Sequence, residues 1–375
     1  MTTKKNEQKI DFIWCSPHPN HYNSYMFEHL AQIEEIDFRA VYFKEKLVKY
    51  PWKTNFSGRL SVYYLSVFFG LDWKFIVNRI FNKRELLSIA GWNNPTMLII
   101  LIYFSITNRK FVLFSDTPET KTERSVKGYF RRKILNYVFK KTFKFLVTGS
   151  SGVKNSIALG VKRDKLINFP FATNINYYVP SQEEGLTSKQ IKFISSGRLD
   201  NAHKAYDLAI EAFCLLKTRH PEYSFQYRIA GTGPDQEQLQ ALIRERKMNN
   251  EVSLLGWFEP ADLVSFYQSG DVFLHPSHVD PFPNAVLEAM ACGLPIVGSD
   301  AAGSVVDRVI EGENGYIHQD HNIESLYGKL LLICEQTPEQ RILMGGKSRE
   351  TAEKWHVSYN TGVIQSIVQD YLIKA

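Results

Sequence analysis

Several features are scarce or absent in this chain of 375 residues, and each absence excludes a class of protein. The longest uninterrupted apolar run, Met97 to Phe104, is far short of the roughly 20 residues that a membrane-spanning helix needs. Only four cysteines occur, so the sequence has neither a CxxC pair nor a disulfide framework: Cys15, Cys214, Cys292 and Cys334. Thiols without partners are typical of a reducing compartment.

Signals for export and for several kinds of catalysis are also missing. The N-terminus is polar (MTTKKNEQK), and the apolar stretch after it is too short for the core of a secretory signal. There is no DxD motif to hold Mg²⁺ or Mn²⁺ on a diphosphate, and no HExxH, Walker or GxSxG motif. We therefore expect a cytoplasmic protein with no metal site and no bound cofactor.

Short apolar runs alternate with helical patterns along the whole chain. Runs such as Ile10–Cys15, Phe111–Phe114 and Ile191–Ser196 are typical of buried strands, and Asn94 with Pro95 has the form of a helix cap and first turn. This alternation predicts βαβ units and mostly parallel sheets, the α/β class. The pattern stops at residues 179–189, which are polar and carry Pro and Gly, as an interdomain linker does. We predict an N-terminal domain over residues 1–182, a second over 183–355, and a C-terminal helix over 356–375.

The positive charge is concentrated in one segment. The net charge is +6, yet Lys121 to Lys144 alone has nine Lys/Arg and one acidic residue, Glu123, and so carries +8. One basic helix is too small a footprint for a nucleic-acid protein, so we expect no nucleic-acid partner. Apolar residues at Val126, Phe130, Ile134 and Val138 are compatible with an amphipathic helix that faces anionic lipid or a lipid-linked acceptor. An ordinary helix with a solvated basic face is the alternative.

The strongest chemical signal is the run DPFPNAVLEAM, which begins at Asp280. Pro281 and Pro283 favour an extended loop, and we expect Asn284 to cap the helix that follows. Glu288 then lies about one turn inside that helix. The free amides at a helix start attract anions, and the two carboxylates can accept hydrogen bonds from sugar or ribose hydroxyls. A surface loop followed by a core helix explains the same spacing.

Two cations follow the first strand of the second domain. Arg198 leaves the carboxyl end of Ile191–Ser196, where open α/β sheets bind ligands. Lys204 is expected in or just before the first turn of the next helix, where it opposes the helix dipole unless an anion lies nearby. Two cations beside one diphosphate could replace a metal ion. A solvated lysine at a helix start is the plainer interpretation.

Two further segments carry weaker signals. Gly231 belongs to a GTG turn after a strand. The dinucleotide fingerprint needs a third glycine, so a tight strand-to-helix turn is the better interpretation. His18 and His21 lie in a loop between the first strand and the first helix, where they could contact a sugar or an acceptor.

These residues together resemble a known family. The run DPFPNAVLEAMACGLPIVGSD resembles the E-x7-E signature of glycosyltransferase family 4, whose members are retaining enzymes of the GT-B fold. The segments GRLDNAHKAYD, IAGTGP, LLGWFEPADLVSFYQSGDVFLHPS and DRVIEGENGY are similar to that family in order and spacing. The resemblance covers about residues 192–315 and is weaker in the N-terminal half. It implies two Rossmann-like domains that face each other across a cleft.

The resemblance also implies roles for particular residues. Arg198 and Lys204 would hold the diphosphate, Glu288 the ribose and Asp280 the donor sugar. Backbone amides at Phe282, Asn284, Ala285 and Val286 would touch phosphate or sugar, and Phe258 would lie beside the base. Two departures stand out: Asp280 replaces a glutamate and is one methylene shorter, and Pro281 removes an amide where glycine is common.

The resemblance therefore implies a metal-independent, retaining glycosyltransferase with UDP or GDP as the donor nucleotide. A bacterial polysaccharide, a lipopolysaccharide or a lipid-linked saccharide is the expected acceptor, with a peripheral position on the inner membrane face. A non-catalytic nucleotide-sugar-binding subunit and another GT-B enzyme, such as a sugar-nucleotide epimerase, are the alternatives.

Overall fold

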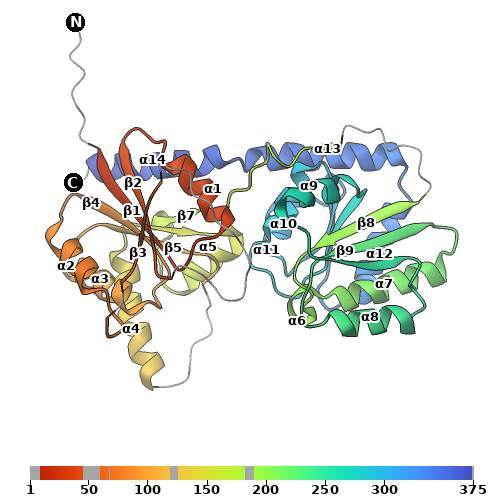
Figure 1. Ribbon diagram of the computed structural model, residues 1–375, viewed down its shortest axis with the longest axis horizontal. Coiled ribbons are helices and arrows are strands. Elements are labelled where there is room, and N and C mark those ends of the chain that lie inside the picture. Colours follow the sequence, from red (N-terminus) through yellow and green to blue (C-terminus); the bar gives the residue numbers. More distant parts are fainter. Residues whose placement is uncertain (1–8, 45–59, 67, 119–125, 182–189, 374–375) are drawn as a thin grey trace, which may run out of the picture. The chain divides into compact units, whose positions relative to one another are not determined.

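The computed structural model describes residues 9–44, 60–66, 68–118, 126–181 and 190–373. The chain forms two compact units. Unit 1 comprises Met1–Ala172 with Val357–Ala375, and unit 2 comprises Thr173–His356. Figure 1 shows a sheet flanked by helices in each unit.

Unit 1 is built on one parallel sheet with the strand order β3-β2-β1-β4-β5-β6-β7. Its strands are β1 (Ile10–Ser16), β2 (Ile36–Tyr42), β3 (Ser61–Tyr64), β4 (Glu85–Ala90), β5 (Phe111–Ser115), β6 (Lys144–Val147) and β7 (Leu166–Asn168). Its helices are α1 (His21–Leu30), α2 (Trp73–Phe81), α3 (Pro95–Ile106), α4 (Val126–Lys141), α5 (Gly149–Ala158), a 3-10 turn η1 (Arg163–Lys165) and α14 (Val357–Ile373). In Figure 1 the helices α2, α3 and α4 gather at one side of this unit.

Unit 2 repeats the same plan with the order β10-β9-β8-β11-β12-β13, again all parallel. Its strands are β8 (Ile191–Ser196), β9 (Phe225–Ala230), β10 (Val252–Gly256), β11 (Val272–His275), β12 (Ile296–Ser299) and β13 (Gly315–His318). Its helices are α6 (Asn201–Lys204), α7 (Tyr206–Arg219), α8 (Gln236–Glu245), α9 (Pro260–Gln268), α10 (Asn284–Ala291), α11 (Gly303–Arg308), α12 (Ile323–Cys334) and α13 (Pro338–Lys354). The predicted α/β class is confirmed in both units.

Packing explains where one unit ends and the other begins. Ile175 and Tyr178 are buried in the core of unit 2, so the division falls about ten residues before the predicted boundary at 182/183. Ile364, Ile367 and Val368 of α14 are buried with β-strand residues of unit 1, which returns the C-terminal helix to the N-terminal unit. Most of the predicted linker, residues 182–189, lies outside the described residues.

Local sequence rules account well for several elements. Asn94 caps α3 by accepting a hydrogen bond from the Met97 amide at 3.2 Å, and Pro95 takes the first helical position, as predicted. Val272, Phe273 and Leu274 are fully buried in β11, so a continuous apolar run forms a central strand. Across the described segments, every helix is too short or too polar to cross a lipid bilayer.

Candidate functional site

The order of strands in unit 2 determines where a ligand can bind. β8 and β11 are neighbours, but the chain reaches β9 and β10 on one side of β8 and β12 and β13 on the other side of β11. The connections therefore diverge between β8 and β11, which opens a crevice at the carboxyl ends of these strands. Gly197 follows β8 at this edge, and His275 ends β11 there.

The turn after β8 brings Lys204 back toward Gly197. The short helix α6 ends at Lys204, Ala205 adopts a left-handed conformation (φ 52°), and α7 then begins at Tyr206. A Cβ atom on Gly197 would lie 3.5 Å from Lys204 Cε and 2.9 Å from the Tyr206 hydroxyl, so only glycine leaves room for this return. Lys204 thus precedes the helix, within the range that the sequence predicts.

Lys204 and Asp280 meet directly. Lys204 Nζ donates to Asp280 Oδ2 and forms an ion pair with it. The same carboxylate oxygen lies 3.1 Å from His275 Nε2, and Ser277 Oγ lies 3.0 Å from that nitrogen. Since the carboxylate can only accept, the His275 ring donates through Nε2.

The electrostatics of this cluster favour a charged Asp280 beside a neutral His275. Burial opposes ionisation of the Asp280 carboxyl, but the hydrogen bond from His275 and the charge of Lys204 outweigh it and lower its pKa to about 2. Burial also lowers the pKa of His275, so this imidazole is uncharged at pH 7. Asp280 is therefore an anion held between one cation and one neutral donor.

Glu288 lies deeper, where two tyrosines surround it. The Tyr267 hydroxyl donates to Glu288 Oε2 at 2.8 Å and lies 2.8 Å from Ser196 Oγ, at the end of β8. Burial and the Glu288 carboxylate raise the pKa of Tyr267 and of Tyr178. Both phenols therefore stay protonated beside Glu288. Through Tyr267 the Glu288 carboxylate is linked to Ser196, the last residue of β8.

The loop before α10 is held by its backbone. The Gly303 amide donates to the Asp280 carbonyl at 3.0 Å, and the Ser304 hydroxyl donates to the Pro283 carbonyl at 2.8 Å. The prediction that Asn284 caps α10 is wrong, because Pro283 takes the cap position in extended conformation and Asn284 is the first helical residue. Pro283 has no side-chain acceptor to offer, so no side chain caps this helix start.

Asn284 is nevertheless placed to bind a polar group. Its side chain is 7% exposed, and its Oδ1 has no hydrogen-bond partner in the described structure. Ala285 and Val286 follow it in the first turn, so their amides also lie at this end of α10.

Phe282 turns away from this polar cluster. Its ring is buried and lies 6.2 Å from the Trp355 ring, and the Arg308 guanidinium stacks 4.4 Å from its centroid. Burial lowers the pKa of Arg308 to about 9. Of Phe282, only the backbone is therefore a candidate for ligand contact. Phe258 is half-buried against Phe266, with ring centroids 5.1 Å apart.

Arg198 and Gly231 lie outside the cluster of Lys204, Asp280 and His275. The Arg198 side chain is 48% exposed and lies 3.8 Å from Asp200, its ion-pair partner among the described residues. A Cβ atom on Gly231 would lie 1.8 Å from the Gly197 carbonyl oxygen, which favours the tight-turn interpretation of the GTG segment. The missing side chain of Gly231 thus leaves room for Gly197, the residue before Arg198.

The two histidines of the N-terminal loop belong to unit 1. His18 Nδ1 lies 3.2 Å from the Pro19 carbonyl oxygen, just after β1. The side chain of His21 lies outside the described atoms. In unit 1 the strands β1 and β4 are the neighbours at which the connections diverge, so His18 stands at the equivalent edge of that sheet.

His275, Ser277, Tyr267, Tyr178 and Ser196 were missed in the sequence. His275, Tyr267 and Tyr178 contact Asp280 or Glu288 only through the fold, so spacing in the sequence gave no signal for these contacts. Ser277 and Ser196 in turn contact His275 and Tyr267. The position of His275 at the last residue of a buried apolar strand was the one available signal.

Comparison with known proteins finds a family match in the second half of the chain. Residues 180–351 match the model of the family described as glycosyl transferases group 1. An uncharacterized glycosyltransferase from Haemophilus influenzae is 28% identical over 156 residues, 42% of this chain and 43% of that protein. The amylovoran biosynthesis glycosyltransferase AmsK of Erwinia amylovora is 26% identical over 177 residues, 45% of this chain and 42% of its own. The matched region thus spans less than half the length of these curated relatives.

A solved structure extends the likeness to the whole fold. The crystal structure of Anabaena HepE in complex with UDP aligns with 97% of this chain and 100% of its own, at a TM-score of 0.69 and 16% sequence identity. At this identity the likeness concerns the fold alone, and it confirms the predicted GT-B class. Most of unit 2, residues 180–351, thus matches the glycosyl transferases group 1 family, and the whole chain has the GT-B fold.

Proposed function

We propose that the chain is a retaining glycosyltransferase that moves a sugar from a nucleotide-diphosphate sugar to a saccharide acceptor. The observation that carries the proposal is the meeting of Lys204, Asp280 and His275 at the diverging strand ends of unit 2. The carboxyl edge of such a sheet is where nucleotides bind. The family match covers the unit that holds these residues.

The diphosphate would lie against Lys204, Arg198 and the start of α10. Lys204 brings a cation into a part-buried position, and Arg198 is exposed enough to turn toward an anion. The amides of Asn284, Ala285 and Val286 add the positive end of the helix dipole. We assign the donor sugar to Asp280, and the ribose hydroxyls to Glu288. The likeness to family 4, beyond the group 1 family, is part of this proposal.

This arrangement would supply the charge that a metal supplies in DxD enzymes. As the glycosidic bond breaks, negative charge grows on the leaving diphosphate. Groups that turned toward the diphosphate when it bound can stabilise this charge without further reorganisation. That phosphate can take the acceptor proton on the same face of the sugar, so no separate general base is needed for a retaining transfer. We therefore expect chemistry that is independent of Mg²⁺ and Mn²⁺.

UDP is the first nucleotide to test, since HepE binds it and has the same fold. The role of AmsK in amylovoran biosynthesis favours a growing surface saccharide as the acceptor. We assign acceptor binding to unit 1, with His18 and His21 as candidates. A cytoplasmic location with peripheral attachment to the inner membrane face fits such an acceptor.

The test is a donor screen with the purified full chain. Thermal shifts with UDP, GDP and ADP should identify the base, and mass spectrometry should then detect transfer or slow hydrolysis of the matching sugar nucleotide. Mg²⁺ and Mn²⁺ should change the rate less than twofold. Nucleotide binding without any hydrolysis or transfer would favour the non-catalytic subunit, and conversion of the donor to its epimer would favour the epimerase.

A second part of the proposal concerns membrane attachment through one side of unit 1. The helix α2 packs on α3, and α3 packs on α4. Large apolar side chains are exposed along these helices and the turn before α2: Phe68, Phe69, Trp73, Val77, Phe81, Ile99, Ile106, Tyr129, Phe130, Ile134 and Tyr137. Trp73, Val77 and Phe81 follow one another at four-residue intervals and are 53%, 46% and 79% exposed.

Basic side chains lie on or next to the same helices as these apolar residues. Lys74, Lys83, Arg131, Arg132 and Lys133 are all exposed on α2, on α4 or just after α2. Val138 and Phe139 anchor the far end of α4 in the core, so the predicted apolar stripe runs from the core into solvent. Apolar anchors with a basic rim favour an anionic lipid surface.

Vesicle flotation distinguishes this surface from an ordinary solvated face. The protein should float with phosphatidylcholine vesicles that contain phosphatidylglycerol, and less with phosphatidylcholine alone. Phe81→Ser should weaken binding roughly tenfold or more, because burial of a Phe contributes about 2 kcal/mol. Leu343→Ser in α13, which is 72% exposed, is the matched control. Equal flotation of both variants would contradict this attachment.

A further inference from the structure

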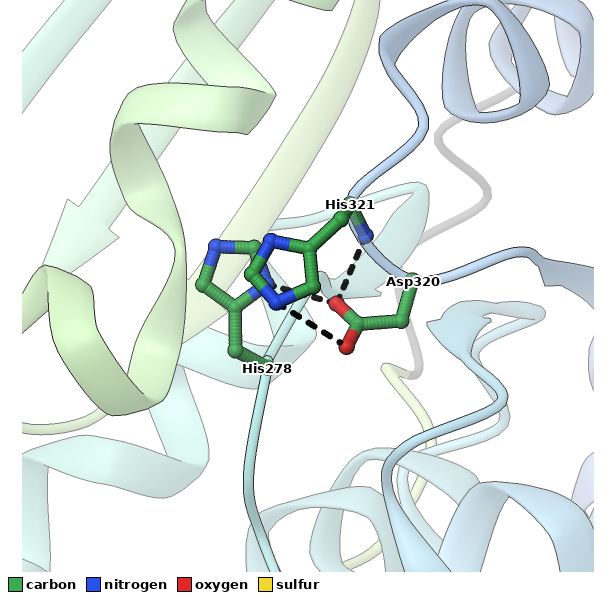
Figure 2. A group of neighbouring side chains, drawn as sticks. All are labelled: His278, Asp320 and His321. Carbon is green, nitrogen blue, oxygen red and sulfur yellow. Dashed lines mark hydrogen bonds and ion pairs between the residues drawn. The ribbon is translucent and has the colours of Figure 1, made fainter.

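Three side chains with metal-binding atoms gather beside the loop that carries Asp280 (Figure 2). They are His278, Asp320 and His321, and one ligand atom from each lies within 4.8 Å of the others. His278 Nδ1 lies 2.5 Å from Asp320 Oδ1, and His321 Nε2 lies 3.5 Å from Asp320 Oδ2. The two imidazole rings stack with centroids 3.8 Å apart.

The fold brings these residues together from two loops at one sheet edge. His278 follows β11, and Asp320 and His321 follow β13, with β12 between the two strands. Asp300, just after β12, accepts a hydrogen bond from the Asp320 amide at 2.8 Å and so fixes that residue's position. His278 and Asp320 are 42 residues apart, so the ligand set forms no short motif, which explains why the sequence predicts no metal site.

We propose that His278, Asp320 and His321 bind one divalent transition-metal ion of the Zn²⁺ class. Two imidazole nitrogens and one carboxylate oxygen are a donor set that suits Zn²⁺, Co²⁺ and Ni²⁺. Mg²⁺ and Ca²⁺ prefer oxygen ligands and should bind far more weakly. A water molecule would complete a four-coordinate site at the protein surface.

Only small movements separate the present geometry from coordination. In a tetrahedral site the His278 nitrogen and the Asp320 oxygen must stand roughly 3.3 Å apart, so the metal replaces the hydrogen-bonded proton as this gap widens slightly. His321 must turn its ring out of the stack to aim a nitrogen at the ion. Its side chain is 72% exposed, so solvent rather than packed protein lies around the ring.

The backbone already places His321 beside the other two ligands. His321 adopts a left-handed conformation with φ 53°, and its amide donates to Asp320 Oδ1 at 2.8 Å. That conformation is uncommon for a residue with a side chain and holds the ring over His278. His278 itself is largely buried, with 14% of its side chain exposed, so its ring direction is fixed by packing.

The metal would brace the loop that binds the donor sugar. His278 lies two residues before Asp280, and the Val279 amide between them donates to the His203 carbonyl at 3.2 Å, near Lys204. A bridge from His278 to the β13–α12 loop would limit movement of Asp280. This consequence rests on the proposed function, whereas the metal site itself does not.

The test measures Zn²⁺ binding to the full chain, without a purification tag, after removal of metals with a chelator. Competition with a chromogenic chelator should give one Zn²⁺ per chain, and Asp320→Ala and His321→Ala should each weaken binding at least about tenfold, as loss of even an outer partner does in known sites. Substitution with Co²⁺ should produce the visible absorption bands of a four-coordinate ion. His220→Ala, which removes a His from a His–Glu pair elsewhere in unit 2, should leave binding unchanged.

Equal Zn²⁺ binding by the wild type, Asp320→Ala and His321→Ala would overturn the site, as would binding by none of them. His321 is exposed, so His321→Ala should fold like the wild type, and a circular dichroism spectrum checks this. The readout needs no sugar nucleotide. Zn²⁺ binding with no transferase activity would refute the proposed function alone, and activity without Zn²⁺ binding would refute the metal site alone.

Discussion

Lys204 and Asp280 are 76 residues apart in sequence and form an ion pair that joins the turn after β8 to the loop before α10. Their side chains are only 21% and 14% exposed, so solvent screens the pair weakly. The pair neutralises the charge of Lys204 where a diphosphate is proposed to bind. A bound diphosphate must therefore compete with Asp280 for the ammonium group.

This competition predicts opposite effects of Asp280→Asn on binding and on turnover. The amide keeps the shape of the side chain but removes the competing charge, so UDP should bind several-fold more tightly. Sugar transfer should fall about 100-fold, because the proposed contact with the donor sugar loses its charge. Calorimetric titration with UDP and the transfer rate measure the two effects. Asp262→Asn, at an exposed position of α9, is the control, and weaker UDP binding by Asp280→Asn would contradict the competition.

Tyr267→Phe should weaken nucleotide binding because it removes a hydrogen bond to Glu288. A hydrogen bond to a charged group contributes about 1.5–3 kcal/mol, so UDP affinity should fall roughly tenfold or more. Tyr227→Phe is the matched control: its hydroxyl is also buried, but it lies 2.8 Å from Ser195 Oγ and does not contact Glu288 in the described structure. Calorimetry with both variants measures the difference. Equal UDP affinities of the two variants would show that the hydrogen bond from Tyr267 to Glu288 does not contribute to nucleotide binding.

Gly197 and Gly231, which follow β8 and β9, lie so close together that a side chain on Gly231 should destabilise the fold. In Gly231→Ala the new Cβ would meet the Gly197 carbonyl oxygen at 1.8 Å, so the backbone must move. We expect a loss of at least about 2 kcal/mol in the free energy of unfolding. Gly328→Ala in α12 has no atom within 4 Å of the new Cβ and should gain about 0.5–1 kcal/mol. Thermal or urea unfolding separates the two, and equal stability of the variants would contradict the packing described.

Features of unit 2 that depend on local sequence rules were predicted well. The apolar run Ile191–Ser196 forms β8 with these bounds, and Lys204 lies just before α7, as predicted. The strand β4 is buried throughout and was not predicted, because a short apolar run without alternation is ambiguous.

Long-range contacts account for what the sequence could not predict. Tyr267 of α9 meets Glu288 of α10 only in the folded chain, and no spacing rule pairs the two residues. Asn284 was assigned one position too early in the helix, since two prolines before it made the cap position ambiguous. The sequence suggested a bound anion beside Lys204, which stays a prediction, and it gave no sign of the ion pair with Asp280.

The cysteines provide a test of burial in both units. Burial raises the pKa of Cys292 and of Cys334 to about 12, and raises that of Cys15 further. At pH 8 only on the order of one in ten thousand of the Cys292 and Cys334 thiols is then a thiolate, the reactive form. Iodoacetamide should therefore modify the half-buried Cys214 first and the other three only after unfolding. Peptide mass mapping measures the order in which the cysteines are modified. Early modification of Cys292 would contradict its burial at the end of α10.

Lys204→Met provides the most direct test of the central claim, that this ammonium group stabilises the leaving diphosphate. The substitution keeps an unbranched side chain, one atom shorter, and removes its charge. Lys217→Met, the control, removes a lysine paired with Glu251 at 2.7 Å on the same unit. The turnover number for sugar transfer should fall about 100-fold or more in Lys204→Met and stay unchanged in Lys217→Met. A Lys204→Met enzyme that transfers sugar at the wild-type rate would contradict the account.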